Sequence, residues 1–435
     1  MFRPRSLLGL VPLAVCCLLL ATPGAASAEP TTAVSYPAGA NTTFYHGEAF
    51  DTCDAPPLSA MQAWSASPYR GIGIYIGGAN RTCAQANLTP SWVLSVTHLG
   101  WRFLPIYMGR QAPCTLRPNS VKITPSAAAS EGTAAAQDAI TRAKALGLIS
   151  GGGIYADMEN YDASDTACRT AVLRFLSAWT KELHRQGWAS GVYANLSSGA
   201  QHLSGVYTST TYARPDALWL ARWDLSPSLT GWSGIADGKW ANRQRGKQYR
   251  GDHTETYGGV TLNIDNDYFN GPAALPGIYY QVEGAASVTA RTGPSTSASA
   301  AGTVTRGQTL RLSCQAAGTK VSTTSVWDKL TNGWYVSDYY VDTPSDTGYS
   351  NPLPKCRYPY QTTVDGLTER TGPGTSYSAV RTLPNGSLAW IMCQRAGTKV
   401  GTTSVWDRLD DGRYVTDYYV ATTSNTTYTR PAPRC

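Results

Sequence analysis

Several features are missing from this sequence of 435 residues, and each absence excludes a class of protein. After Leu20 no stretch approaches the roughly eighteen consecutive apolar residues that a membrane-spanning helix needs. No C-x-x-C pair occurs, and the five histidines show neither i,i+4 nor HExxH spacing, so no metal site is expected. No G-x-G-x-x-G follows a strand-like segment, and no cofactor is expected. Basic runs are also absent, which argues against nucleic acid as a partner.

The N-terminus has the three parts of a secretory signal peptide. Arg3 and Arg5 form a short basic region, Leu7 to Leu20 is apolar but too short to span a bilayer, and Ala26-Ser27-Ala28 offers a cleavage site. We therefore expect residues 1–28 to be removed and the mature chain to begin at Glu29. Such a protein is secreted, extracellular or associated with the cell wall, with no membrane contact after cleavage. An uncleaved membrane anchor is the alternative.

The C-terminal third contains a tandem repeat. Cys314, Trp327, Asp338 and Cys356 recur as Cys393, Trp406, Asp417 and Cys435, each displaced by 79 residues. A fixed offset without insertions indicates two copies of one folding unit. Short Val/Thr/Tyr-rich runs separated by Gly, Pro and Asn predict β-structure in both copies. We expect small all-β modules at 278–356 and 357–435, preceded by a linker at 271–277.

Residues 45–270, after a flexible lead-in over 29–44, alternate between strand-like and helix-like segments. Strands are expected at 49–54, 71–77, 101–108, 153–159, 189–195, 217–223, 239–244 and 260–268, and helices at 59–67, 130–146 and 166–186. Most of these strands are apolar through their middle, as in a parallel sheet that is buried on both faces. Eight strands interleaved with helices predict an α/β fold of the (β/α)8 TIM-barrel type. An open doubly wound sheet is the alternative.

Eight cysteines remain after signal cleavage, and an even number in an exported chain predicts disulfides. The equal spacing within the repeat predicts Cys314–Cys356 and Cys393–Cys435. In the barrel, Cys53 and Cys83 follow neighbouring strands, as do Cys114 and Cys168. We therefore predict Cys53–Cys83 and Cys114–Cys168, although sequence alone does not fix connectivity.

Carboxylates stand where a barrel places its reactive groups, at the C-terminal ends of strands. Asp51 lies toward the end of the first expected strand, Asp157 and Glu159 end the fourth, and Asp265 and Asp267 end the eighth. Asp157 and Glu159 are two residues apart and share a strand face. Barrel closure makes the first and eighth strands neighbours, which brings Asp51 beside Asp265. Crowding of like charges raises carboxyl pKa values, as a general acid in glycoside hydrolysis requires.

Aromatic residues near other strand ends are candidate sugar-binding side chains, and Asp267 is a further candidate for binding substrate. These aromatic residues are Tyr107, Tyr155, Tyr193, Trp219 and Trp223. The alternative is that such aromatics belong to the hydrophobic core.

At these positions the barrel resembles the family-25 glycoside hydrolases, which are lysozyme-type N-acetylmuramidases. The matching pieces are Phe50-Asp51, the D-x-E pair at 157–159, GVYAN at 191–195, LWLAR at 218–222 and Ile264-Asp265. FDTCDAP at 50–56, GIYIGG at 73–78 and LPIY at 104–107 resemble more closely a family of exported glycoside-hydrolase-like domains of unknown function. The resemblance implies that Glu159 is the general acid, with Asp51, Asp157 and Asp265 as supporting carboxylates. The loops after the first three strands, which hold three cysteines, depart from the lysozyme pattern.

The two repeats resemble bacterial SH3-like domains, through VTARTGPS at 288–295, LTERTGPG at 367–374 and the W-D-[KR]-L segments. This resemblance implies modules that bind the peptides or glycans of a cell wall. We therefore expect a monomeric, secreted glycoside hydrolase of a β-linked amino-sugar polymer, with bacterial peptidoglycan as the leading candidate, held at the wall by its modules. The alternatives are a non-catalytic wall-binding or carbohydrate-binding protein with a degenerate barrel, and a hydrolase of another polysaccharide. Whether the mechanism is retaining, inverting or substrate-assisted is not fixed by the sequence.

Overall fold

Eight strands close a barrel in the computed structural model, which describes residues 43–429 and 432–435. The expected signal peptide lies outside the described residues, as does nearly all of the lead-in. The barrel strands follow one another in chain order: β1 (Phe44–Asp51), β2 (Gly71–Gly77), β3 (Arg102–Tyr107), β4 (Gly153–Met158), β5 (Ala189–Asn195), β6 (Ala217–Ala221), β7 (Arg245–Tyr257) and β8 (Val260–Pro272).

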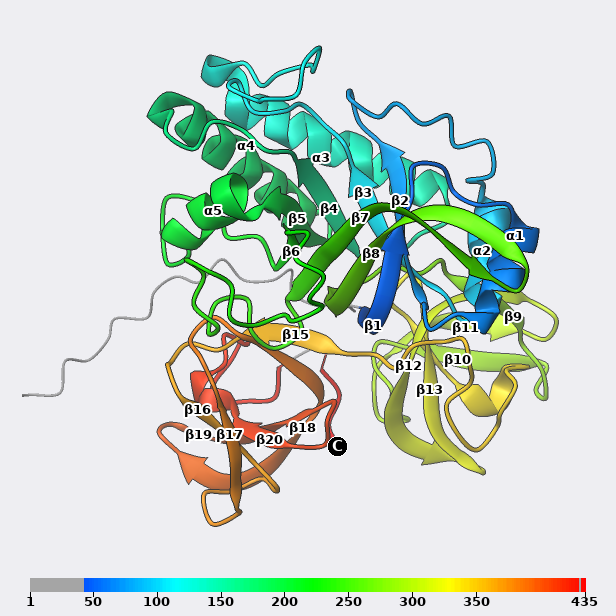
Figure 1. The fold of residues 1–435 in the computed structure, drawn as a ribbon. Coiled ribbons are helices and arrows are strands. Elements are labelled where there is room, and N and C mark those ends of the chain that lie inside the picture. The colour runs from blue at the N-terminus through cyan, green and yellow to red at the C-terminus, as the bar shows by residue number, and fades with distance from the viewer. Residues whose placement is uncertain (1–42, 430–431) are drawn as a thin grey trace, which may run out of the picture. The chain divides into compact units, whose positions relative to one another are not determined.

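Helices follow the first five strands and cover the outside of the barrel, where α3 and α4 lie side by side (Figure 1). They are α1 (Leu58–Ala63), η1 (Trp64–Ala66), α2 (Pro90–His98), η2 (Pro125–Ala127), α3 (Ala128–Ala145), α4 (Thr166–Arg185), η3 (Leu196–Ala200) and α5 (Gln201–Gly205). All three helices expected from the sequence overlap these elements. Among the described residues, no helix is long and apolar enough to cross a membrane.

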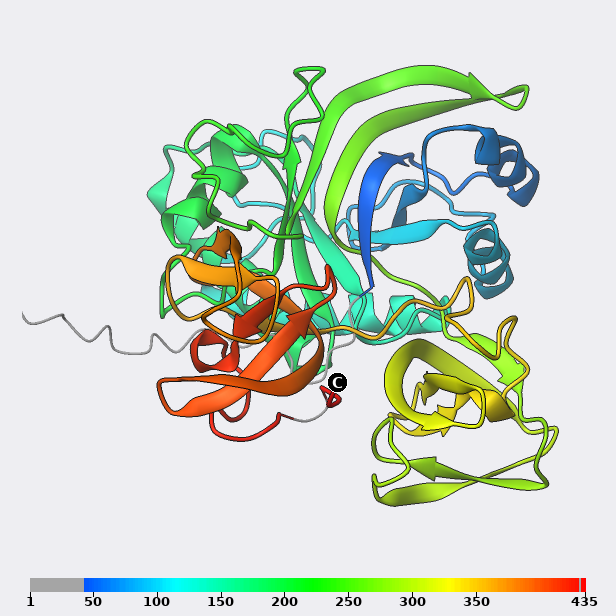
Figure 2. The same cartoon turned by 90° about the horizontal axis from the view of Figure 1, so that it is seen from below.

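The last quarter of the barrel departs from the (β/α)8 pattern. Strands β1 to β7 pair in parallel, but β8 runs antiparallel to both β7 and β1. None of the residues between Ala221 and Val260 is helical, and β7 passes to β8 through the Gly258-Gly259 turn. The architecture is therefore a closed mixed α/β barrel whose final strands form a long hairpin, shown in green in Figure 2.

The strand expected at 239–244 is wrong. Trp240, Asn242 and Arg243 in that segment have φ angles of 47°, 49° and 69°, which belong to turns and not to a strand. The seventh strand begins instead at Arg245 and carries the polar side chains of Lys247 and Gln248 into the protein, where both are buried. A strand with a polar buried face gives none of the apolar signal by which a parallel strand is recognised. The other expected strands all overlap observed ones.

Two hydrophobic layers hold the barrel together. Side chains that point inward, among them Tyr155, Trp219 and Phe269, fill the interior. A larger cluster between the strands and the surrounding helices includes Phe50, Trp64 and Trp179. Alternate residues on each strand therefore serve different cores, as in other packed barrels.

The segment expected to be a linker, 271–277, packs along the barrel. Ala273 and Ala274 are fully buried, Ala274 pairs with Phe103, and Pro276 pairs with Leu148. The described structure therefore continues the barrel through most of this segment before the first module begins.

Two curled antiparallel sheets follow the barrel, and each is described by itself. The first contains β9 (Ile278–Gln281), β10 (Ser287–Arg291), β11 (Ala300–Thr305), β12 (Thr309–Val321), β13 (Thr324–Leu330), β14 (Tyr335–Ser337) and η4 (Asp338–Tyr340). The second contains β15 (Tyr358–Gln361), β16 (Leu367–Arg370), β17 (Ala379–Leu383), β18 (Leu388–Val400), β19 (Thr403–Leu409), β20 (Tyr414–Thr416) and η5 (Asp417–Tyr419). Their strand orders are β11-β10-β14-β13-β12-β9 and β17-β16-β20-β19-β18-β15, so the repeated sequence forms the same sheet twice.

All four predicted disulfides are present. The Cα atoms are 5.7 Å apart in Cys53–Cys83, 5.9 Å in Cys114–Cys168, and 5.1 Å in both Cys314–Cys356 and Cys393–Cys435. These separations are ordinary for a disulfide. Such bonds persist in oxidising compartments, which supports export of the chain.

Each curled sheet contains a buried pair of carboxyl groups joined by one amide. The Nε2 of Gln315 donates to Oδ1 of Asp328 and to Oδ1 of Asp338, both at 2.9 Å, and all three residues are fully buried. Gln394, Asp407 and Asp417 repeat this arrangement in the second sheet. Burial raises the pKa of Asp338 to about 6, and burial together with the charge of Asp338 raises the pKa of Asp328 well above its usual range. The two carboxyls therefore share a proton.

We expect the sheets to lose stability as the pH rises. The pKa values of these buried aspartates are raised in the folded state, so their protonation stabilises the fold. This contribution is fully present below the unfolded pKa of about 3.9 and is lost as the pH rises through about 6 and above. The double variant Asp328→Asn/Asp407→Asn, which keeps a donor without a charge, should raise the melting temperature of the sheets at pH 8 by several degrees and change it little at pH 5. For a domain of this size 1 kcal/mol corresponds to roughly 4–8 °C.

Calorimetry of the full chain at the two pH values measures this effect. Glu283→Gln is the matched control, because Glu283 is exposed in the same module, between β9 and β10, and belongs to neither buried pair. A double variant whose melting temperature varies with pH as strongly as that of the wild type would show that the pairs do not carry the dependence.

Candidate active site

The carboxylates selected from the sequence meet at one mouth of the barrel. Asp51 ends β1 and is the direct register partner of Asp265 on β8, while Asp157 lies in β4 and Glu159 follows it. All four line a cavity of about 360 Å³. Because β8 runs antiparallel, Asp265 lies in the middle of its strand and not at the strand end as expected, yet it is still level with Asp51.

Asp267 lies deeper in the barrel. It pairs in register with Ala49, is fully buried and is not part of the cavity lining. Its Oδ1 accepts a 2.8 Å hydrogen bond from Nε1 of Trp219, and burial together with the charge of Asp51 raises its pKa. Asp267 is thus part of the same electrostatic cluster but has no access to a ligand in the cavity.

Burial sets the protonation of this cluster. Burial, and then the charge of Asp265, raises the pKa of Asp51 to about 7. Burial, followed by the charge of Glu159, raises the pKa of Asp157 well above its usual range, although Arg117 opposes the shift. Burial is also the main cause that raises the pKa values of Asp265 and Asp267. Some of these carboxyls therefore carry protons at neutral pH.

Glu159 lies in a different environment from Asp157. Its side chain is 32% exposed, and its Oε1 is 3.2 Å from Nη1 of Arg117. A positive charge therefore lies beside Glu159, whereas Asp157 is 3% exposed and its burial favours the protonated form. The charge of Glu159 acts on Asp157 and favours the protonated form of that carboxyl.

A buried glutamine that the sequence analysis missed connects the cluster. Gln248 on β7 donates from Nε2 to Asp51 Oδ2 at 2.7 Å and to Asp265 Oδ2 at 3.1 Å. Its Oε1 accepts from the hydroxyl of Tyr193 and from Nε1 of Trp223, both at 2.9 Å. With both ends of the amide occupied, the orientation of Gln248 is fixed and its donor end faces the carboxylates. Gln248 was not among the predicted site residues because the seventh strand was predicted at 239–244, before the strand on which it lies.

The loop after β3 supplies the other missed groups. Gln111, fully buried, donates from Nε2 to the carbonyl of Asp157 at 2.8 Å and accepts from the backbone N–H of Glu159 at 2.8 Å. This loop also carries Arg117. The cavity lining further includes Arg81, Asp252 and Asn263, which lie in loops and in the β7–β8 hairpin. Their positions at the cavity depend on tertiary contacts, which a local sequence pattern does not indicate.

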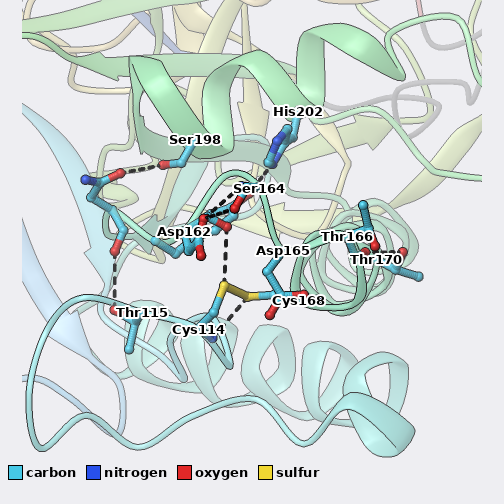
Figure 3. Close-up of a disulfide and its surroundings, with 12 residues drawn as sticks. Cys114, Thr115, Asp162, Ser164, Asp165, Thr166, Cys168, Thr170, Ser198 and His202 are labelled. Carbon is cyan, nitrogen blue, oxygen red and sulfur yellow. Dashed lines mark hydrogen bonds between the residues drawn. A yellow bond between two sulfur atoms is a disulfide. The ribbon is translucent and has the colours of Figure 1, made fainter.

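The Cys114–Cys168 disulfide ties this loop to α4 (Figure 3). The backbone N–H of Cys114 lies 3.0 Å from Sγ of Cys168, and the Thr115 hydroxyl donates to the carbonyl of Asn160 at 3.3 Å. Asp165 lies close to both sulfur atoms, but its carboxylate caps α4 by accepting from the backbone N–H of Cys168 at 2.9 Å. Because Cys114 and Cys168 are joined in a disulfide, the cluster that they form with Asp165 offers no thiolate to a metal. It anchors the loop that positions Glu159.

The candidate sugar-binding aromatics divide into two groups. Tyr193 and the 63% exposed Trp223 line a second cavity of about 340 Å³, with Glu159, Asn195, Ala221 and Arg222. Tyr107, Tyr155 and Trp219 line neither of these cavities. Tyr107 points to the helices, where its hydroxyl donates to Asp138 at 2.8 Å, while Tyr155 and Trp219 fill the barrel interior. Strand alternation turns Tyr107 toward the helices, whereas Tyr155 and Trp219 point into the barrel like Asp157 and Tyr193 but line neither cavity.

A closed α/β barrel with four carboxyl groups gathered at one mouth is the arrangement of a glycoside-hydrolase-like domain. Residues 62–269 match the family model described as Rv2525c-like, glycoside hydrolase-like domain. The barrel of this chain is similar to that family over these residues, which make up slightly less than half of the chain. Asp51 precedes the matched segment, whereas Asp157, Glu159 and Asp265 lie within it.

Individual relatives and solved structures match parts of the chain. The uncharacterized protein YraJ of Bacillus subtilis is 38% identical over 68 residues, which is 13% of this chain and 58% of the relative. The structure of the Mycobacterium tuberculosis Tat-secreted protein Rv2525c in complex with L-tartrate is 16% identical with a TM-score of 0.38, covering 52% of this chain and 96% of that one. The modular autolysin LytC from Streptococcus pneumoniae is 12% identical with a TM-score of 0.33, covering 51% of this chain and 46% of that one.

Proposed function

We infer that this protein is an exported glycoside hydrolase that cleaves a β-linked amino-sugar polymer, with peptidoglycan as its substrate. The observation that carries this function is the pair of carboxyl environments at one cavity. Asp157 is buried, which raises its pKa and favours its protonated form, whereas Glu159 beside it is partly exposed and lies against Arg117. Glycoside hydrolysis needs one carboxyl to give a proton to the leaving oxygen and another to face the positive charge that develops on the sugar.

Within this proposal Glu159 delivers the proton. Its side chain is the more exposed of the two and lines both cavities, whereas Asp157 is 3% exposed and lines only the carboxylate cavity. Asp157, whose pKa is raised by burial, is proposed to store the proton that passes through Glu159 to the leaving oxygen. Asp51 and Asp265, held by Gln248, face the developing positive charge from the opposite strands.

The Arg117–Glu159 ion pair also favours a second candidate function, that of a carbohydrate-binding protein whose barrel has no catalytic activity. Incubating the full chain with purified peptidoglycan, and separately with other polysaccharides, and measuring the reducing ends released distinguishes the two. Release from peptidoglycan above that from the other polymers supports the hydrolase. Sedimentation with insoluble peptidoglycan without release of reducing ends favours the binding protein, and release only from another polysaccharide makes the barrel a hydrolase of that polymer.

The two curled sheets are proposed to be SH3-like modules that hold the barrel at the cell wall. Two copies of one weak site on one chain increase the apparent affinity through effective concentration. We therefore expect a fragment of residues 278–435 to sediment with insoluble peptidoglycan without the barrel. A fragment that ends at residue 277 is the matched control. If 278–435 stays in the supernatant while the control sediments, the sheets are spacers.

A further inference from the structure

Glu159 lies at the junction of two cavities. Among the residues that line the carboxylate cavity and the cavity beside β5 and β6, Glu159 is the one present in both. Their volumes are about 360 Å³ and 340 Å³, each at the lower end of the range for small-ligand sites. A proton donor at such a junction can reach a bond between two groups that occupy neighbouring cavities.

Trp223 forms an aromatic wall in the second cavity and is held in one orientation. Its indole N–H donates to Gln248 at 2.9 Å. One part of its ring lies against the backbone of Gly251, where a Cβ atom would come within 2.2 Å of the ring. The side chain nevertheless remains 63% exposed and belongs to none of the hydrophobic clusters of the barrel. A tryptophan fixed at its edge and backed by a glycine, with so much of its surface in solvent, is preorganised to bind an apolar face.

Polar groups lie beside this wall. Oδ1 of Asn195 accepts from the backbone and hydroxyl of Ser197, at 2.9 and 2.7 Å, which leaves the Nδ2 group of the amide as its donor. Nε of Arg222 is 2.9 Å from Asp224. An aromatic face, an amide and a guanidinium together suit a pyranose ring, which has apolar C–H faces and a polar edge.

We propose that the second cavity is a sugar subsite, so that a glycan lies across Glu159 with one unit in the carboxylate cavity and the next against Trp223. This inference rests on the proposed function and deepens it. A chain bound on both sides of the scissile bond is cut within its length, and a substrate that ends at the carboxylate cavity loses the contact with Trp223.

Binding to the full chain carrying Glu159→Gln tests the subsite without turnover. The probe is the hexamer of β-1,4-linked N-acetylglucosamine, and the readout is the heat of binding in a calorimetric titration, which does not depend on Trp223 as a reporter. Adding Trp223→Ala should weaken binding roughly tenfold or more, on the scale of a lost apolar contact in a pocket. Gly251→Ala should do the same, because its new Cβ displaces the indole, and Trp223→Tyr should retain part of the affinity. Leu225→Ala is the matched control, since Leu225 is 71% exposed nearby and lines neither cavity.

Equal affinity in the parent and the Trp223→Ala protein would overturn the subsite. A hexamer that does not bind the parent at all would overturn it as well. In either case the proposed function stands if the wild type releases reducing ends from peptidoglycan. If hexamer binding depends on Trp223 but the wild type cleaves no polymer, the subsite belongs to a carbohydrate-binding protein and the hydrolase proposal fails by itself.

Discussion

Replacing Glu159 with glutamine is expected to abolish glycan hydrolysis and to leave the fold intact. Glutamine keeps the shape of the side chain and a hydrogen-bond donor, but it has no proton to give to the leaving oxygen. Loss of general acid catalysis alone should lower turnover by about 10²–10⁴-fold. The measurement is the release of reducing ends from purified peptidoglycan by the full-length variant and the wild type.

The melting temperature of the Glu159→Gln protein should change little. The variant loses the ion pair with Arg117, in which the Glu159 side chain is 32% exposed and the Arg117 side chain 42% exposed. Such exposed pairs contribute roughly 0–1 kcal/mol to the free energy of unfolding. Glu131→Gln is the matched control, because it removes a Glu–Arg pair with Arg110, 3.5 Å apart, that lies outside both cavities. The control should keep full activity.

Variants of the other carboxylates test the role of each residue in the cluster. Asp157→Asn, Asp51→Asn and Asp265→Asn should each slow hydrolysis, through loss of the stored proton or of the negative charge that faces the sugar. Wild-type turnover in Glu159→Gln would show that another group is the acid, and Asp157, whose pKa is raised by burial, would be tested next. A wild type that cleaves no glycan would leave the binding-protein interpretation.

The carboxylate cluster was predictable because it depends on few facts about the fold. Asp157 and Glu159 share a face through strand alternation, and Asp51 meets Asp265 because a barrel must close. The reversed direction of β8 leaves this neighbour relation intact, so the prediction survived an error about the strand. The same alternation places Tyr155 and Trp219 in the barrel interior, where large aromatic side chains near strand ends can also lie.

The groups around the carboxylates were not predictable for a physical reason. Gln248 lies on a strand that is polar and buried, so neither hydrophobic periodicity nor surface composition marks it. Gln111 and Arg117 lie on a loop whose course depends on Cys114–Cys168 and on contacts with β4. Long-range contacts of this kind are set by tertiary structure, and a local sequence pattern does not contain them.

Gln248 is the second residue whose replacement should have a large effect, and two substitutions separate its two contributions. Gln248→Glu keeps an oxygen that accepts from Tyr193 and Trp223 but removes the N–H groups that bind Asp51 and Asp265. The donor lowers the pKa of Asp51, so its loss should leave Asp51 more protonated at neutral pH. Turnover should fall roughly 10²–10³-fold, as when one preorganised donor is removed from an active site. The KM should stay near that of the wild type, because Trp223 keeps its partner.

Gln248→Met removes both contributions, so kcat should fall as in Gln248→Glu and KM should also rise as Trp223 loses its anchor. Each buried group left without a partner costs about 1–3 kcal/mol, so the melting temperature should fall in this variant. Gln244→Met is the matched control: Gln244 is fully buried and donates to the carbonyl of Asp216 at 2.7 Å, but lines neither cavity. The control should lose stability without a change in kcat or KM. If Gln248→Met behaved like the control, the amide would be structural, and the ionisation of Asp51 would not depend on it.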